Sequence, residues 1–262
     1  MTADYHVHTY YSHDSSCPMA DMIERALELG IDELCFTDHV DYGINSDEDN
    51  CCYERYFEEL ERRKKEYEGR IKIKRGIEFG VQRHTKAEYE RDAGKYPFDF
   101  IILSNHQIDD KGFWDQSYQK GKTQDEYHKA YYEELLWLVE NYNDYSVLGH
   151  LDMIKRYDRM GDYPDHRITD TVEAIFKKII PAGKGIEVNT SSFHYGLKDL
   201  TPSRKLLALY RDMGGELITL GSDAHSTEYL GDHIPEVKNI LRDMGFKYFC
   251  TFTELKPEFH KL

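Results

Sequence analysis

Short apolar segments alternate with amphipathic segments along most of the chain. The apolar segments are typical of buried β-strands, and the amphipathic segments have the spacing of helices with one buried face. We expect strands over residues 3–8, 31–39, 71–80, 97–106, 145–152, 184–190, 216–225 and 247–252. We expect helices over residues 19–30, 53–67, 123–142, 201–215 and 233–245.

The alternation of strands and helices predicts the fold class. A strand that is followed by a helix and then by another strand usually adds to a parallel sheet. We therefore expect an α/β fold whose parallel sheet is either closed as a barrel or open and doubly wound. No Pro-rich or Gly/Ser-rich linker interrupts the pattern, so we expect one domain over residues 1–262.

The composition and charge argue against some partners. The chain has 49 Asp and Glu against 34 Lys and Arg, and its formal net charge of −15 opposes attraction to a nucleic acid. No segment approaches the roughly 18 apolar residues of a membrane span, and the first residues lack the apolar run of a signal peptide. The five cysteines form no C-x-x-C pair and suit reduced thiols, so we expect a cytoplasmic protein.

Histidines and carboxylates stand at the ends of seven predicted strands. In a β/α barrel the carboxyl ends of the strands share one face, so residues far apart in sequence meet there. Within the first strand, positions i and i+2 point to the same side, so the two histidines of DYHVHT could bind one ion. The pattern as a whole predicts a site for several metal ions. The strand-end residues are His6, His8, Asp38, His39, Glu78, His106, His150, Glu187, Asp223 and His225.

Seven short motifs resemble those of one enzyme family. They are DYHVHT, SHD, FTDH, GIEFG, SNH, GHLD and GSDAH, and they follow one another over nearly the whole chain. Their order resembles that of the polymerase-and-histidinol-phosphatase (PHP) family of metal-dependent phosphoesterases. The segments GHLDMIKRYD, EVNTS and GFKYFCTF, with residues 200–225, resemble the stand-alone histidinol-phosphate phosphatases of histidine biosynthesis.

The resemblance implies a single distorted (β/α)7 TIM-like barrel with three divalent ions, for which zinc, iron or manganese are suitable. It implies a first ion bound by His6, His8, Glu78 and Asp223. Glu78 would bridge this ion to a second one, bound by His106 and His150. Glu187 has no place among these ligands, and we expect it to fix an imidazole from behind.

The third ion leaves a choice between two neighbouring residues. The resemblance implies the ligands Asp14, His39 and His225. Many relatives have a histidine where Asp14 stands, so His13 is an alternative ligand.

The resemblance implies hydrolysis of L-histidinol phosphate to L-histidinol and phosphate, and the expected ions suit this chemistry. A phosphate monoester is a dianion that repels hydroxide. Divalent ions can neutralise its oxygens and lower the pKa of a bound water to about 7. Glu78 and Asp223 are the expected catalytic carboxylates, and either Asp223 or a bound water could protonate the leaving alkoxide.

Two further segments are candidates for binding the substrate. Arg156 follows the fifth strand and could hold two phosphate oxygens at once, with Lys155 and Arg159 as competing candidates. Residues 107–122 could form a lid, in which Phe113 and Trp114 stack on the imidazole of the substrate. An ammonium group could meet Asp109, Asp110 or Asp115 in the same segment. The sequence Thr190-Ser191-Ser192 departs from the Thr-Ser-Gly of many relatives.

Other functions differ from this one in testable ways. An amidohydrolase usually needs a bridging Lys on the fourth strand, where this chain has His106. A nuclease or a polymerase-associated PHP module could use the same metals, but the net charge disfavours it. A PHP phosphatase that acts on phosphotyrosine protein or on a nucleotide is the closest alternative, and a metal-binding scaffold without activity is a further one.

Overall fold

A parallel sheet forms the centre of the computed structural model, which describes residues 1–46 and 49–262. Neighbouring strands are parallel and follow one another in chain order. In that order the strands are β1 (Ala3–Val7), β2 (Glu33–Phe36), β4 (Lys72–Gly80), β5 (Phe100–Ser104), β8 (Val147–Leu148), β9 (Gly185–Asn189) and β10 (Ile218–Gly221). The short strand β3 (His39–Val40) also pairs with β4, beyond the end of β2.

The two edges of this sheet meet at the carboxyl ends of its first and last strands. Val7 at the end of β1 forms a parallel bridge with Ala224, which follows β10. The backbone N–H of His8 donates to the carbonyl of Ala224 at 2.9 Å, and the N–H of Asp223 donates to the carbonyl of His6 at 2.8 Å. The sheet is therefore a nearly closed, distorted barrel of seven strands, which confirms the predicted fold class.

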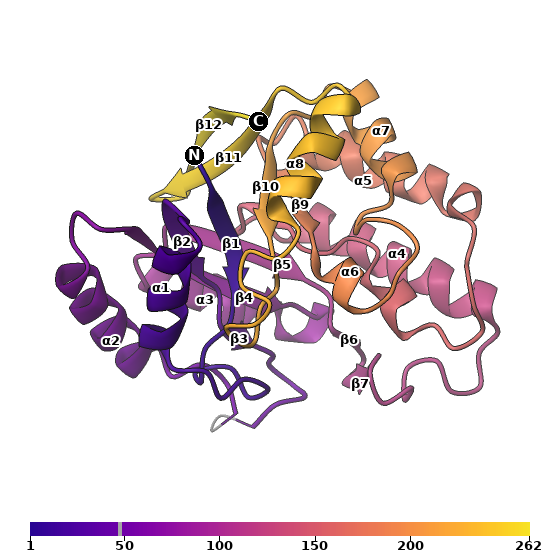
Figure 1. Ribbon diagram of the computed structural model, residues 1–262. Helices are drawn as coiled ribbons and strands as arrows, with labels where there is room; N and C mark the ends of the chain where they lie inside the picture. The colour runs from indigo at the N-terminus through magenta and orange to yellow at the C-terminus, as the bar shows by residue number, and fades with distance from the viewer. Residues whose placement is uncertain (47–48) are drawn as a thin grey trace.

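Helices surround the barrel (Figure 1). They are α1 (Met19–Glu28), α2 (Tyr53–Glu66), α3 (Lys86–Lys95), α4 (Gln124–Asn141), α5 (Thr169–Ile179), α7 (Arg204–Asp212) and α8 (Ile234–Asp243). All five predicted helices are present, and α3, α5 and the four-residue α6 (Ser191–His194) are additional. Among the described residues, no helix is long and apolar enough to cross a membrane.

The sequence explains how these helices begin and pack. Helix α4 starts at a capping box, in which the N–H of Thr123 donates to Glu126 at 2.7 Å and the N–H of Glu126 donates to the Thr123 hydroxyl at 3.3 Å. Helix α1 packs on the barrel through one buried face that consists of Met19, Met22, Ile23 and Ala26. The helices cover the outer face of the strands and side chains fill the inside of the barrel, so the strands are buried on both faces, which accounts for their continuous apolar sequence.

The eighth predicted strand lies outside the barrel. Residues Tyr248–Thr253 form β11, which pairs antiparallel with β12 (Lys256–Lys261). Figure 1 shows this hairpin at the end of the barrel where both chain termini lie. Tyr5 of β1 joins the barrel to the hairpin, because its buried hydroxyl donates to Glu33 and accepts from the N–H of Phe252 at 2.7 Å.

Replacement of Tyr5 by Phe tests this connection. Tyr5→Phe leaves the buried Glu33 carboxylate and the Phe252 N–H without this partner, so we expect a loss of about 1–3 kcal/mol in the free energy of unfolding. Urea unfolding at a fixed metal concentration measures the effect. Tyr67→Phe is the matched control, because Tyr67 bonds the exposed Glu24 and water can replace its hydroxyl. Equal losses in both variants would contradict a special role for Tyr5.

Candidate active site

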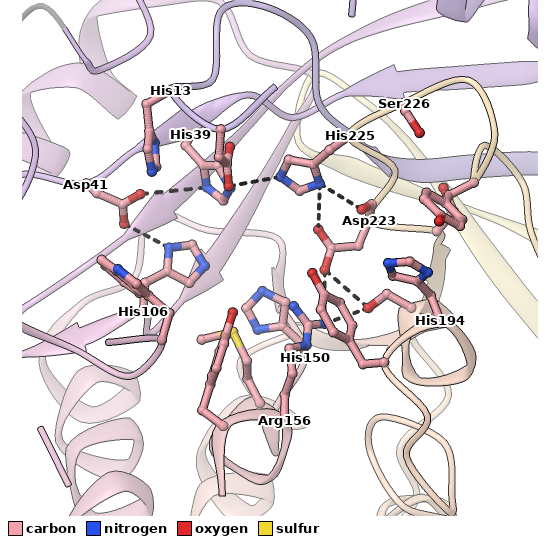
Figure 2. Close-up of a pocket in the computed structure, with 18 residues that line it drawn as sticks. His13, His39, Asp41, His106, His150, Arg156, His194, Asp223, His225 and Ser226 are labelled. Carbon is pink, nitrogen blue, oxygen red and sulfur yellow. Dashed lines mark hydrogen bonds and ion pairs between the residues drawn. The ribbon is translucent and has the colours of Figure 1, made fainter. Parts of the chain in front are cut away.

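A cavity of about 510 Å³ opens where the barrel strands end. Figure 2 shows His39, Asp41 and His106 on one side of it, Asp223 and His225 on the other, and Arg156 between them. Aromatic side chains form much of the remaining wall, and they are Trp114, Tyr157, His194, Tyr195 and Tyr229. Residues from both halves of the chain therefore meet at one site, as the strand-end pattern predicts.

Glu78 lies at the centre of the histidine cluster with no exposed surface. Its Oε2 lies 3.1 Å from His6 Nε2 and 3.0 Å from His39 Nδ1. Its Oε1 lies 3.1 Å from His106 Nε2 and 2.9 Å from His150 Nε2. The two oxygens thus face two different groups of histidines, which is the arrangement that a bridging ligand requires.

Asp223 completes the first predicted group. Its Oδ1 lies 3.5 Å from His6 Nε2 and 3.4 Å from His8 Nε2. The backbone of Asp223 has a φ of 57°, in the left-handed region that Asp tolerates better than most residues. Such conformations cluster at functional sites, and here the conformation occurs two residues beyond the end of β10.

Asp14 rather than His13 lies at the third predicted group. Asp14 Oδ2 is 3.3 Å from His225 Nε2 and 3.7 Å from His39 Nε2. The His13 ring lies farther out, with Nδ1 at 3.1 Å from the amide of Asn45. Asp14 is the most exposed of the predicted ligands, so this group forms the outer edge of the cluster.

Polar side chains fix several of the imidazoles from behind. His6 Nδ1 lies 2.5 Å from Glu187, His8 Nδ1 lies 3.0 Å from Ser12, and His106 Nδ1 lies 2.8 Å from Asp41. Each of these contacts leaves Nε2 turned toward Glu78 or Asp223. Such partners set the tautomer and orientation of metal-binding histidines.

Two of these supporting contacts require glycine in the strands. A Cβ at Gly80 would lie 1.8 Å from the carboxylate of Asp41, and one at Gly221 would lie 2.4 Å from that of Glu187. The barrel backbone therefore approaches both carboxylates more closely than any other residue would allow. Asp41 was absent from the predicted site, although it follows His39 at the i+2 spacing that places two side chains on one face.

The cluster combines opposite charges with buried nitrogen and oxygen atoms that make no hydrogen bond within the described residues, as a metal site does. Burial opposes ionisation of Glu78, but His6, His106 and His39 outweigh it and hold the pKa of Glu78 well below its ordinary value. Burial likewise opposes protonation of His6, but Glu187, Glu78 and Asp223 hold its pKa well above the ordinary value. In the described part of the chain, the buried atoms without a hydrogen bond include His6 Nε2, His8 Nε2, His225 Nε2 and Glu78 Oε2.

Triads of ligand atoms within 4.8 Å of one another occur throughout the cluster. One triad joins His6, His8 and Asp223, three of the four ligands predicted for the first ion. Another joins His6, Glu78 and His150, and it combines ligands predicted for the first and the second ion. Two further triads are His8, His39 and His225, and His39, Asp41 and His106. Unpaired imidazole nitrogens and carboxylate oxygens at this density fit divalent ions.

Of the three basic candidates for phosphate binding, Arg156 faces the cavity. Its Nη2 lies 3.1 Å from Asp223 Oδ2 and donates to the Ser191 hydroxyl at 2.5 Å. Its guanidinium also lies 4.0 Å from the centre of the Tyr195 ring. Lys155 instead pairs with Asp152 and Asp165, and Arg159 borders a separate pocket.

The prediction that Phe113 contacts the substrate is wrong in this structure. Phe113 is fully buried and packs against Tyr118 and Tyr131, with ring centres 5.1 and 5.5 Å away, because the segment turns its side chain into the core. Its neighbour Trp114 does line the cavity and is 44% exposed. Segment 107–122 thus contributes one of its two predicted aromatic residues.

The aspartates of the same segment also lie away from the cavity. Asp110 accepts from the Gln82 side chain at 2.8 Å, and Asp115 borders the separate pocket of Arg159. The residues that line the cavity include neither Asp109, Asp110 nor Asp115. The cavity is lined instead by side chains that the sequence analysis did not propose as substrate contacts, namely Tyr157, Ser191, His194, Tyr195, Ser226 and Tyr229.

Comparisons with known proteins agree with this geometry. The family model of the PHP domain matches residues 4–191. A histidinol-phosphatase of Lactococcus lactis is 30% identical over 98% of this chain and 97% of its own, and a "Probable histidinol-phosphatase" of Thermotoga maritima is 28% identical over 94% of both. The crystal structure of the histidinol phosphate phosphatase of L. lactis, complexed with zinc, L-histidinol and phosphate, superposes with a TM-score of 0.90. That comparison has 29% identity and covers 98% of each chain.

A change at Glu78 tests whether the two histidine groups depend on one carboxylate. Glu78→Gln removes the negative charge that both groups face, so we expect bound divalent metal to fall to half or less of the wild-type content. Elemental analysis of the purified protein measures this content. Glu134→Gln is the matched control, since Glu134 is a buried carboxylate that pairs with Arg83 outside the cluster. Full metal content in Glu78→Gln would refute the bridging role.

Proposed function

The chain belongs to the PHP domain family, and we propose that it is a phosphomonoesterase that hydrolyses L-histidinol phosphate to L-histidinol and phosphate. The observation that carries this proposal is the similarity over 98% of the chain to an enzyme crystallised with L-histidinol and phosphate. Such an enzyme acts in histidine biosynthesis. The cavity in this chain offers both the metal-binding donors and the buried cation that this reaction needs.

We assign three divalent ions, zinc, iron or manganese, to the cluster around Glu78. His6, His8, Glu78 and Asp223 would hold the first ion, Glu78, His106 and His150 the second, and Asp14, His39 and His225 the third. The distances of Glu78 Oε1 and Oε2 to separate histidines support the bridging role. When bound, such ions neutralise phosphoryl charge and make water more acidic.

Arg156 binds the phosphate of the substrate. Its side chain is only 6% exposed, so a phosphoryl oxygen would meet it in a largely dry environment, where a charge-assisted hydrogen bond is strong. One Nη atom holds Asp223 and Ser191, while Nε is buried and makes no hydrogen bond to any described residue. The guanidinium therefore has donors left for the phosphate.

Asp223 is an anion before the reaction. Burial opposes its ionisation, but His6, His8 and Arg156 hold its pKa well below the ordinary value. An ionised carboxylate has no proton to give, so Asp223 could protonate the leaving alkoxide only after taking a proton from the attacking water. A metal-bound water is the alternative proton donor.

The organic part of the substrate meets an aromatic wall. The carboxylates that line the cavity, Asp14, Asp41 and Asp223, all belong to the histidine cluster. Trp114 offers an exposed indole face to an imidazole, and an aromatic face also attracts an ammonium group. This wall suits a small phosphomonoester that carries an imidazole and an ammonium group.

We also propose that residues 1–262 form one domain and that the protein is cytoplasmic. The first and last barrel strands, β1 and β10, come from opposite ends of the chain and meet, which supports a single domain. The five cysteines are free thiols, as suits a reducing compartment.

The substrate assignment predicts an order of activities. Metal-loaded protein should release phosphate from L-histidinol phosphate with a higher kcat/KM than from phosphotyrosine, AMP or an aryl phosphate, because only the first presents an imidazole and an ammonium to the aromatic wall. A phosphate-release assay with each compound decides the order. A tenfold preference for phosphotyrosine or a nucleotide would transfer the proposal to that alternative. No turnover in fully metallated protein would leave only the metal-binding scaffold.

Arg156→Ala separates phosphate binding from metal binding. The variant loses a charge-assisted contact of about 1.5–3 kcal/mol, so kcat/KM should fall roughly 10- to 150-fold. Metal content should stay at the wild-type level, because no proposed ligand is removed. Arg159→Ala is the control, because Arg159 is exposed and lies outside the cavity. An unchanged kcat/KM in Arg156→Ala would falsify the assignment.

A further inference from the structure

The short segment that carries Arg156 has too few backbone hydrogen bonds of its own to fix its position. Arg156 lies in η2 (Met153–Tyr157), a single 3₁₀ turn with backbone hydrogen bonds of 2.8 Å from Met153 to His150 and 3.0 Å from Lys155 to Asp152. Short 3₁₀ segments have poor hydrogen-bond geometry and little intrinsic stability. The position of the guanidinium must therefore depend on side chains that fasten this turn to the rest of the protein.

One fastening lies just before Arg156. The ammonium of Lys155 donates to Asp152 at 2.9 Å and to Asp165 at 2.6 Å. Ser203 bonds both aspartates, through its N–H at 3.1 Å and its hydroxyl at 2.6 Å. Lys155 is thereby turned away from the cavity, and its neighbour Arg156 is turned toward it.

A second fastening follows Arg156 by two residues. The carboxylate of Asp158 is 3% exposed and accepts from the Tyr127 hydroxyl at 2.6 Å and from His128 Nε2 at 2.6 Å. It also accepts from the Gln124 amide at 2.8 Å and from the N–H of Met160 at 2.8 Å. The three side-chain donors all come from the first turns of α4, so one carboxylate ties the end of η2 to a long helix.

His128 makes this attachment rigid. The side chain has no exposed surface, and its ring stacks on Tyr163 with centres 3.9 Å apart and planes within 6°. Burial lowers the pKa of His128 in spite of the neighbouring Asp158, so the neutral ring donates from Nε2. Because the His128 ring is buried and stacked on Tyr163, it cannot move with Asp158, so a shift of the turn would break this hydrogen bond.

We propose that Asp158 is a positioning residue, which holds Arg156 at the distance from Asp223 and Ser191 that phosphate binding needs. The inference rests on the proposed function, because it assigns Asp158 a role through Arg156. Only Tyr157 separates the two residues, so a shift of Asp158 reaches the guanidinium directly. Gln116 also bonds the carbonyl of Tyr157 at 2.8 Å, so loss of Asp158 should loosen the turn without releasing it entirely.

A double-mutant cycle with Arg156→Ala tests the proposal on the intact, metal-loaded protein. Asp158→Ala should lower kcat/KM about tenfold at unchanged metal content, since small misplacements of a binding group have effects of this size. In the Arg156→Ala background the same change should lower kcat/KM less than about twofold, because the group it positions is already absent. The apparent affinity for inorganic phosphate as an inhibitor should fall in each single variant and fall no further in the double variant.

Two controls separate positioning from a loss of folding. Asp158→Asn keeps the size of the side chain and one acceptor oxygen, and we expect it to recover part of the activity lost in Asp158→Ala. Asp125→Ala removes a carboxylate from the same helix that bonds Tyr163 and Arg167, and kcat/KM should stay within about twofold of wild type. The thermal midpoint Tm of every variant is measured alongside.

Two results would overturn the inference while the proposed function stands. The first is wild-type kcat/KM in Asp158→Ala together with a loss in Arg156→Ala. The second is a tenfold loss from Asp158→Ala that persists in the Arg156→Ala background, since it would mean that Asp158 acts through the fold and not through Arg156. Wild-type activity in Arg156→Ala would overturn the role of Arg156 in the proposed function as well. The cycle uses the phosphomonoester that the protein hydrolyses best, so an error in substrate identity does not affect it.

Discussion

Glu78 lies at the centre of the barrel mouth with no exposed surface, and both of its oxygens face imidazole nitrogens within 3.1 Å. An ionised carboxylate at such a depth costs several kcal/mol unless opposite charge surrounds it. The structure meets this requirement with histidines from the ends of several strands. Because those histidines range from residue 6 to residue 150, the charge balance at Glu78 also requires that the sheet curve so that the strand ends converge.

Periodicity along the chain predicted most of the fold, because the parallel strands are buried on both faces and their helices on one. It could not assign the segment 247–252 to a hairpin outside the barrel, since an apolar strand looks alike whether it pairs with β10 or with β12. Helix α5 was missed although it buries Val172, Ile175, Phe176 and Ile179 at helical spacing. That signal was in the sequence.

In the site, too, the side chains on strand ends could be predicted from the sequence, whereas those on loops could not. Side chains at strand ends have a direction that the alternation of the strand sets, so His6 and Glu78 could be placed from sequence alone. A loop carries no such periodicity, and nothing in the dipeptide Phe113-Trp114 indicates which ring enters the core. The hydrogen bonds to Asp158 at the end of η2 could not be predicted either, because their donors lie about 30 residues away on α4.

The proposed phosphate-binding residue, Arg156, has its charge balanced by neighbouring side chains before a substrate arrives, so the net charge of −15 does not prevent an anion from binding there. Arg156 is nearly buried, and a buried cation without a partner would be costly. Asp223 Oδ2 and the Tyr195 ring supply that partner, while Asp223 Oδ1 faces the histidines. A phosphate dianion at the proposed position would replace part of this compensation instead of creating a new demand for it. The guanidinium can therefore stay in place in both states, provided that the turn on either side of it is held, and Lys155 and Asp158 provide that support.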